Sequence, residues 1–153
     1  MKDELVNNLI GLVNRRVVYC RMPMMFPLMV QFEGKDHLMC SRYWELSQYN
    51  RLLATQDDEN DDIINATLCL LFGKKLIGFS IYSDFSLLLC FEDNLDLIFF
   101  TEKEHDIKLK SLPNWELTVY ETNIKSYVVD SQIKLKLEEE PMCQSVEKGN
   151  SGK

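Results

Sequence analysis

Hydrophobic and polar positions along this chain follow mainly the two-residue period of β-strands. Two apolar runs of strand length, Phe26 to Phe32 and Phe85 to Phe91, each end in a polar turn. A short return strand follows each turn, at residues 37–41 and 96–101. Runs of this length between turn residues are typical of strands with at least one buried face. The pattern predicts a β-hairpin in the middle of each half of the chain.

Further strands are predicted on both sides of these hairpins. Residues 16–20 and 76–82 precede them, and the segments Trp44 to Tyr49 and Trp115 to Tyr120 follow them. In the last two segments Trp and Leu alternate with Glu, and successive side chains of a strand point to opposite faces. We therefore expect the Trp and Leu side chains to be buried and the Glu side chains to face solvent. Each half then forms a four-stranded meander.

A helix is predicted at the N-terminus, because the apolar positions between Asp3 and Val13 have helical spacing and Asp3 is a suitable cap. The corresponding segment of the second half, Asp62 to Phe72, suits either a helix or a strand. After the second half, Ile124 to Val129 and Ile133 to Leu137 predict a closing hairpin.

The two halves share a sequence pattern. Trp44-Glu45-Leu46-Ser47-Gln48-Tyr49 recurs as Trp115-Glu116-Leu117-Thr118-Val119-Tyr120, and residues 26–33 match residues 85–92. Upstream, Leu9-Ile10-Gly11 matches Leu71-Phe72-Gly73, and Leu5-Val6-Asn7 matches Ile63-Ile64-Asn65. Four matches in the same order predict an internal duplication.

We expect a single domain over residues 1–137, built from two similar halves. Its parts are a first half at 3–50, an acidic joint at 56–62, a second half at 62–121 and the closing hairpin at 124–137. Residues 138–153 lack periodicity and are predicted to be a disordered tail. One half alone would expose an apolar face, so we expect the halves to cover each other. The predicted fold class is mainly β (α+β), with two β-meander halves in a sandwich or barrel of pseudo-two-fold symmetry and a short N-terminal helix.

The net negative charge of the chain makes nucleic acid a less expected partner. The chain of 153 residues has a net charge of −7, and strong affinity for nucleic-acid phosphates requires clustered Lys and Arg. The joint contains five of the 24 acidic residues, Asp57, Asp58, Glu59, Asp61 and Asp62. Such a loop is either a solvated connection between the halves or a patch that attracts a basic partner.

Other features of the composition indicate a cytoplasmic protein without a cofactor. The first residues lack the basic and apolar segments of a signal peptide, and no apolar run approaches the ~20 residues that span a bilayer. The five cysteines form no Cys-x-x-Cys, so we expect reduced, mostly buried thiols. With only His37 and His105, a zinc site has little support. A homodimer is compatible with the predicted edge strands.

Candidate chemical groups each have a structural alternative. Trp44 and Trp115 could stack on bases, but an alternating Trp on a strand is typical of a core. The repeated carboxylates at Glu33, Glu92, Glu45 and Glu116 fall at turns or on polar strand faces. Asp84 with Asp106-Ile107-Lys108 has the residue types of a metal-dependent nuclease, in a short and degenerate pattern. We expect no catalytic residue, no metal ligand and no enzyme.

A resemblance to a known class of proteins supports the protein-binding hypothesis. In the second half, Gly73 is followed by an apolar strand, then by Phe85-Ser86-Leu87-Leu88-Leu89-Cys90-Phe91-Glu92-Asp93 and by Trp115-Glu116-Leu117. In this pattern the chain resembles small, mostly β bacterial immunity proteins of toxin systems, best over Gly73 to Tyr120 and more loosely over Gly11 to Tyr49. The resemblance implies an inhibitor that binds a cognate toxin without catalysis, and an acidic inhibitor can occupy the basic cleft of a nuclease.

We therefore expect a non-enzymatic inhibitor of a toxin domain with a basic surface, which it binds through Asp57, Asp58, Glu59, Asp61 and Asp62. Met22, Met24 and Met25 would add apolar contacts if they were exposed. One alternative is a nucleic-acid-binding β-domain that uses Arg15, Arg16, Arg21 and neighbouring aromatic residues. The other is the metal-dependent nuclease.

Overall fold

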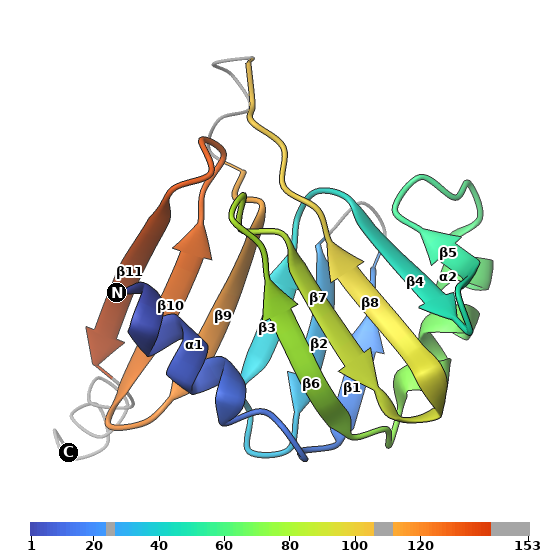
Figure 1. The fold of residues 1–153 in the computed structure, drawn as a ribbon, viewed down its shortest axis with the longest axis horizontal. Coiled ribbons are helices and arrows are strands. Elements are labelled where there is room, and N and C mark those ends of the chain that lie inside the picture. The colour runs from blue at the N-terminus through green and yellow to red at the C-terminus, as the bar shows by residue number, and fades with distance from the viewer. Residues whose placement is uncertain (24–26, 106–111, 142–153) are drawn as a thin grey trace, which may run out of the picture.

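The computed structural model describes residues 1–23, 27–105 and 112–141 as a mainly β fold with two antiparallel sheets (Figure 1). The first half contains α1 (Lys2–Ile10), β1 (Val17–Arg21), β2 (Leu28–Phe32), β3 (His37–Cys40), β4 (Trp44–Gln48) and β5 (Arg51–Thr55). The second contains α2 (Asp61–Leu68), η1 (Cys69–Leu71), β6 (Leu76–Ile81), β7 (Leu87–Phe91), η2 (Glu92–Asn94), β8 (Leu95–Phe99), β9 (Trp115–Tyr120), β10 (Asn123–Val129) and β11 (Leu135–Pro141).

Each sheet is built from strands of both halves. The six-stranded sheet has the order β1-β2-β3-β9-β10-β11, and the five-stranded sheet has the order β5-β4-β8-β7-β6. After three strands, each half sends its Trp strand into the other sheet, so that β4 pairs with β8 and β9 pairs with β3. The prediction of one four-stranded meander per half was therefore wrong for the fourth strand. Alternation along a strand determines which side chains are buried, but it does not determine which strand lies alongside.

A reciprocal set of main-chain hydrogen bonds joins the beginnings of β1 and β6, around the isolated bridge between Arg16 and Lys75. Val17 N donates to Lys74 O (3.0 Å), and Leu76 N donates to Arg15 O (3.1 Å). Gly73 N donates to Val17 O (2.8 Å), and Asn14 N donates to Leu76 O (2.7 Å). In each of these two pairs of bonds, one bond becomes the other when 59 is added to the residue numbers of the first half and subtracted from those of the second (17 becomes 76, and 73 becomes 14). This exchange is the pseudo-two-fold symmetry of the fold.

The same shift relates the helices and their buried faces. Leu5, Leu9 and Leu12 in the first half correspond to Ile64, Leu68 and Leu71, and all six side chains are buried. Asn14 corresponds to Gly73, and both have a left-handed backbone, with φ of +74° and +77°. The structural equivalence thus differs by one to three residues from the sequence matches of Gly11 with Gly73 and of Leu5 with Ile63. Both helices end before a turn of the same geometry.

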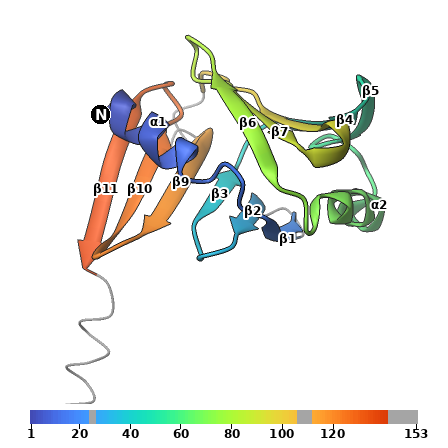
Figure 2. The same ribbon diagram turned by 60° about the horizontal axis from the view of Figure 1, so that its bottom comes forward.

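The two sheets form an open sandwich and not a closed barrel. The rings of Phe32 and Phe91, which the same shift relates, stack between the sheets with centroids 6.3 Å apart. Figure 2 shows α1 against β9 to β11 and α2 at the other end of the molecule, near β1. Accordingly, Tyr127 of β10 donates its hydroxyl to Glu4 of α1 (3.2 Å). The helices therefore cover the parts of each inner face that the opposite sheet leaves open.

Trp44 and Trp115 are fully buried, which confirms that both belong to the core. Trp115 Nε1 donates to the carbonyl of Phe85 (2.7 Å). Trp44 Nε1 is buried and has no acceptor among the described residues. The residue that corresponds to Phe85 is Phe26, which lies outside the described residues.

Several sequence predictions require correction. Asp3 does not cap α1, which begins at Lys2 with no side-chain cap. The segment from Asp62 to Phe72, which suited either a helix or a strand, is helical from Asp61 to Leu71, and Asn60 caps it by accepting hydrogen bonds from two N–H groups of its first turn. Strand β5 was not predicted. Residues 138–141, which were assigned to a disordered tail, belong to β11, whose main chain pairs with β10 although the side chains are polar.

No helix among residues 1–23, 27–105 and 112–141 is long and apolar enough to cross a membrane.

The reciprocal bonds give a matched pair of stability predictions. Glu33 Oε1 accepts from Arg16 N (2.9 Å), and Glu92 Oε1 accepts from Lys75 N (2.8 Å). Glu33→Ala and Glu92→Ala should each lower the free energy of unfolding by about 1 kcal/mol, because a main-chain donor at the bridge loses its acceptor. Urea unfolding measures the change. The matching Gln variants keep an oxygen at this position and should lose less than half as much; equal losses for Ala and Gln would contradict this role.

Candidate functional site

The predicted acidic site consists of the loop between β5 and α2 together with the first two residues of α2. Asp57, Asp58, Glu59 and Asp62 are exposed, and Asp61 is half-buried. All five acidic side chains belong to one short segment, which follows β5 and runs into α2. The loop is therefore anchored at fixed points of both halves.

Local hydrogen bonds give this loop a defined shape. Thr55 N donates to Asp58 Oδ2 (2.9 Å), and Asp57 N donates to Thr55 Oγ1 (3.1 Å). Two residues later, Asn60 Oδ1 accepts from Asp62 N (3.0 Å) and Ile63 N (3.2 Å) and begins the helix. Asp58 thus closes the turn after β5, whereas the carboxylates of Asp57 and Glu59 take no part in these bonds.

No basic residue neutralises the loop within the described part of the chain. The salt bridges there involve other acids, and none reaches residues 57–62. Asp61 and Asp62 lie in the first turn of α2, where the positive end of the helix dipole stabilises negative charge. The helix thus supports two of the acids without removing the negative surface that the loop presents to solvent.

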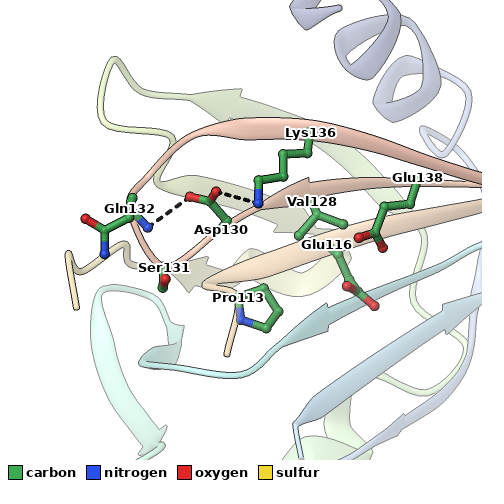
Figure 3. Close-up of a pocket in the computed structure, with 8 residues that line it drawn as sticks. All are labelled: Pro113, Glu116, Val128, Asp130, Ser131, Gln132, Lys136 and Glu138. Atoms are coloured by element: carbon green, nitrogen blue, oxygen red, sulfur yellow. Dashed lines mark hydrogen bonds and ion pairs between the residues drawn. The ribbon is translucent and has the colours of Figure 1, made fainter. Parts of the chain in front are cut away.

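A second acidic surface lies on the outer face of the six-stranded sheet and was missed by the sequence analysis. A groove of about 490 Å³ runs across β9, β10 and β11 (Figure 3). Burial, and then the nearby Glu138 carboxylate, raise the pKa of Glu116 in this groove. The surface was missed because Glu138 was assigned to a tail. The alternation of residues 133–137 continues into this segment and would have placed Glu138 on a strand face.

On the other side of this groove, the negative charge of Asp130 is neutralised by a lysine. Asp130 pairs with Lys136 (3.1 Å). Burial alone would raise the pKa of Asp130, but the N–H groups of Lys134 and Gln132 and the Lys136 ammonium together lower it. The groove therefore holds one neutralised acid and two neighbouring Glu side chains, an arrangement less strongly exposed than the loop at residues 57–62.

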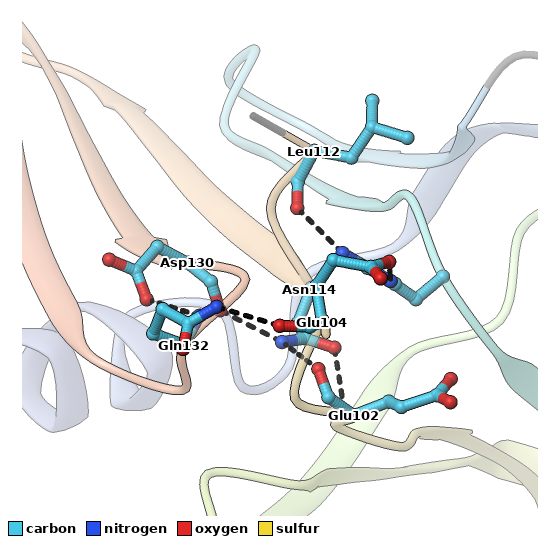
Figure 4. A network of polar contacts seen from close by, with 7 residues as sticks. Glu102, Glu104, Leu112, Asn114, Asp130 and Gln132 are labelled. Atoms are coloured by element: carbon cyan, nitrogen blue, oxygen red, sulfur yellow. Dashed lines mark hydrogen bonds and ion pairs between the residues drawn. The ribbon is translucent and has the colours of Figure 1, made fainter. Parts of the chain in front are cut away.

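A buried polar network beside this groove joins the residues that follow β8 to Asn114, which precedes β9 (Figure 4). The fully buried Asn114 side chain accepts from Glu102 N (2.8 Å) and donates to Glu102 O (3.1 Å) and Asp130 O (2.8 Å). Arg42 Nη1 donates to Glu104 Oε2 (2.7 Å), and both side chains are largely buried. The network thus links the two connections that pass from one sheet to the other, the one between β3 and β4 and the one between β8 and β9.

The remaining candidate groups have structural partners or lie apart. Arg15 pairs with Asp36 (2.9 Å), and Arg16 pairs with Glu92 (3.6 Å), whereas Arg21 is exposed. Met22 is buried, which contradicts its use as an exposed contact; Met24 and Met25 lie outside the described residues.

Of the residues in the nuclease hypothesis, the structure describes only Asp84. Asp84 Oδ1 accepts from Ser86 N within a turn (2.9 Å), and Asp106 to Lys108 lie outside the described residues. No group of three or more His, Cys, Asp or Glu side chains suited to a metal occurs among the residues that are described. Burial raises the pKa of the Cys40 thiol to about 12, so this thiol is a poor nucleophile.

Comparisons with known proteins add no relative: no protein-family model, curated protein or solved structure matches the chain. The resemblance to immunity proteins stays a prediction.

The largely buried ion pair between Arg42 and Glu104 yields a stability prediction. Glu104→Gln should lower the free energy of unfolding by about 3 kcal/mol, because it leaves the buried Arg42 guanidinium without its counter-charge. Glu102→Gln is the control, since the exposed Glu102 contributes only main-chain bonds to the network. Urea unfolding of both variants measures the two changes in the free energy of unfolding. Equal losses would show that Arg42 does not need the Glu104 charge.

Glu116 yields a prediction of pH dependence. Its pKa is higher in the folded than in the unfolded chain, so its ionisation destabilises the fold at neutral pH. Glu116→Gln should therefore stabilise the protein at pH 7. The gain should shrink as pH falls through the raised pKa and vanish below the ordinary value for Glu. Thermal unfolding from pH 7 to pH 4 tests this, and a gain that is constant with pH would contradict the assignment.

Proposed function

We propose that this chain is a non-enzymatic inhibitor that binds a basic partner protein through the acidic loop at residues 57–62, and that the partner is a bacterial toxin domain in the cytoplasm. The observation that supports it is the exposure of Asp57, Asp58, Glu59 and Asp62, none of which forms a salt bridge with another described residue. The pattern shared with immunity proteins supports the choice of a toxin as the partner.

Electrostatics favours such a role for the loop. A local cluster of like charges attracts a surface of opposite charge and raises the association rate by about 10-fold to 1,000-fold at low salt. The turn at Thr55 and the Asn60 cap already define the loop's shape, so little conformational entropy is lost when a partner binds.

Inhibition by this surface requires no chemical step. A nuclease toxin binds nucleic acid through clustered Lys and Arg, because these side chains neutralise phosphates. Carboxylates that occupy the same cleft pair with those cations and exclude the substrate. The inhibitor would then act stoichiometrically, one molecule for each toxin molecule.

The alternatives have less support. Nucleic-acid binding was assigned to three arginines, of which Arg15 and Arg16 are paired with Asp36 and Glu92. The nuclease hypothesis depends on Asp84, whose carboxylate accepts a hydrogen bond within a turn, and on Asp106 and Lys108, which lie outside the described residues.

The proposal predicts a salt-dependent association that the loop controls. The tagged protein is used to capture its partner from cells that produce it, and the purified pair is then studied by stopped flow. Neutralising the loop (D57N, D58N, E59Q, D61N and D62N together) should slow association at low salt by at least about 10-fold and flatten the dependence on salt. The partner's activity should be blocked at a one-to-one ratio by the unaltered chain.

A matched control is available on β11. Neutralising the three exposed acids Glu138, Glu139 and Glu140 to Gln removes a similar cluster elsewhere and should leave the association rate within about 2-fold. Circular dichroism checks that α2 remains folded in the loop variant. An association rate that is insensitive to salt, or that falls only in the β11 control, would refute the loop as the binding surface.

A further inference from the structure

Large apolar side chains are exposed on the side of the molecule where α2 lies against β1. Val18 is 52% exposed, Ile63 is 62% exposed and Phe72 is 46% exposed. Between α2 and β1 runs a groove of about 520 Å³, lined mainly by Val18, Tyr19, Cys20, Ala66, Cys69 and Phe72. Figure 2 shows the two elements side by side at this end of the fold.

On the helix, the other half of the protein shows that the fold does not require the whole exposed face to be apolar, although Ile10 and Ile77, which correspond to Cys69 and Val18, are exposed too. With the shift of 59 that relates the two helices, Ile63, Ala66 and Leu70 correspond to Glu4, Asn7 and Gly11 of α1. The buried positions of the two helices are apolar in both, whereas this exposed stripe is apolar only in α2. Isolated exposed apolar residues are ordinary, but a continuous apolar surface beside a groove marks an interaction site.

The main chain of β1 limits what can enter the groove. At one end, Asn65 of α2 accepts from Met22 N (2.8 Å) and donates to Met22 O (3.1 Å). At the other end, Val17 exchanges main-chain bonds with Gly73 and Lys74. The free edge between these bonds is only a few residues long and contains a bulge at Val18. Such a short edge does not accommodate an added strand, so the groove suits a side chain.

The charge beside the groove indicates the kind of protein that supplies this side chain. Asp62 and Ala66 are four residues apart on α2, so they lie on the same face with Cβ atoms about 6 Å apart. The acidic loop therefore adjoins one end of the apolar groove, and Arg21 is the only basic residue that lines it among those described. A charged rim next to an apolar pocket is the usual anatomy of a protein interface.

We infer that the groove between α2 and β1 receives an aromatic or long aliphatic side chain of the basic partner, flanked by Lys or Arg residues that meet the acidic loop. This inference rests on the proposed function, because the same partner is involved. In such an interface, the charges govern how fast the partner associates and the apolar anchor governs how long it stays.

The symmetry of the fold supplies a matched pair of variants. Val18→Asn with Ala66→Gln makes the groove polar at two exposed positions. Ile77→Asn with Asn7→Gln alters the two corresponding exposed positions of the other half. With the captured partner, the groove variant should dissociate at least about 10-fold faster, with an association rate within about 2-fold of the unaltered chain. The control variant should leave both rates within about 2-fold, and an unchanged dissociation rate for the groove variant would overturn the inference.

A second measurement needs no cognate partner, so it separates this inference from the proposed function. The isotopically labelled full chain is titrated with the acetylated, amidated peptides KRWKK and KRGKK, and amide shifts are followed by NMR. Both peptides should shift the loop, but only the Trp peptide should shift Val18, Ala66 and Cys69, and the groove variant should abolish those shifts. If the Trp peptide shifts the loop alone, the groove is not an anchor site, even where a basic partner is captured and inhibited.

Discussion

The reciprocal main-chain pairing of residues 14–17 with residues 73–76 is the constraint on which the rest of the fold depends. These bonds bring the starts of β1 and β6 together, and each strand then continues into a different sheet. Glu33 and Glu92 hold the same junction by accepting N–H groups at the bridge. Because α1 and α2 lead directly into this junction, it also determines where each helix covers the core.

The exchange of the Trp strands makes the two halves mutually dependent. β4 completes the sheet that β6 to β8 begin, and β9 extends the sheet that β1 to β3 begin. Trp44 and Trp115 are therefore buried on strands that each pair with a strand of the other half. Neither half alone has a complete inner face, so we expect the two to fold as one cooperative unit.

Local patterns predicted much of this structure, and long-range pairing accounts for what they missed. The period of two placed Trp115 and Leu117 in the core, and the polar turns located both hairpins. The partners of β4 and β9 could not be predicted, because they depend on contacts between distant segments. β11 was truncated because Glu138 to Glu140 lack apolar residues, although main-chain pairing alone extends the strand. The acidic loop could be recognised in the sequence as a run of charged residues. The groove could not, because it lies between Val18 and Phe72, and predicting it would have required knowing which residues of α2 face β1.

The joint at residues 57–62 has a consequence for how this protein can change. Within the part of the chain that the structure describes, the pairing of strands from both halves in two sheets holds the halves together, so the loop is a covalent tether between parts that already bind each other. The side chains of Asp58 and Asn60 make the hydrogen bonds that shape it, whereas the side chains of Asp57 and Glu59 make none among the described residues, so folding places few demands on these two positions. Substitutions at those positions alter the surface and leave the scaffold intact. A binding specificity located there can diverge rapidly while the architecture stays constant.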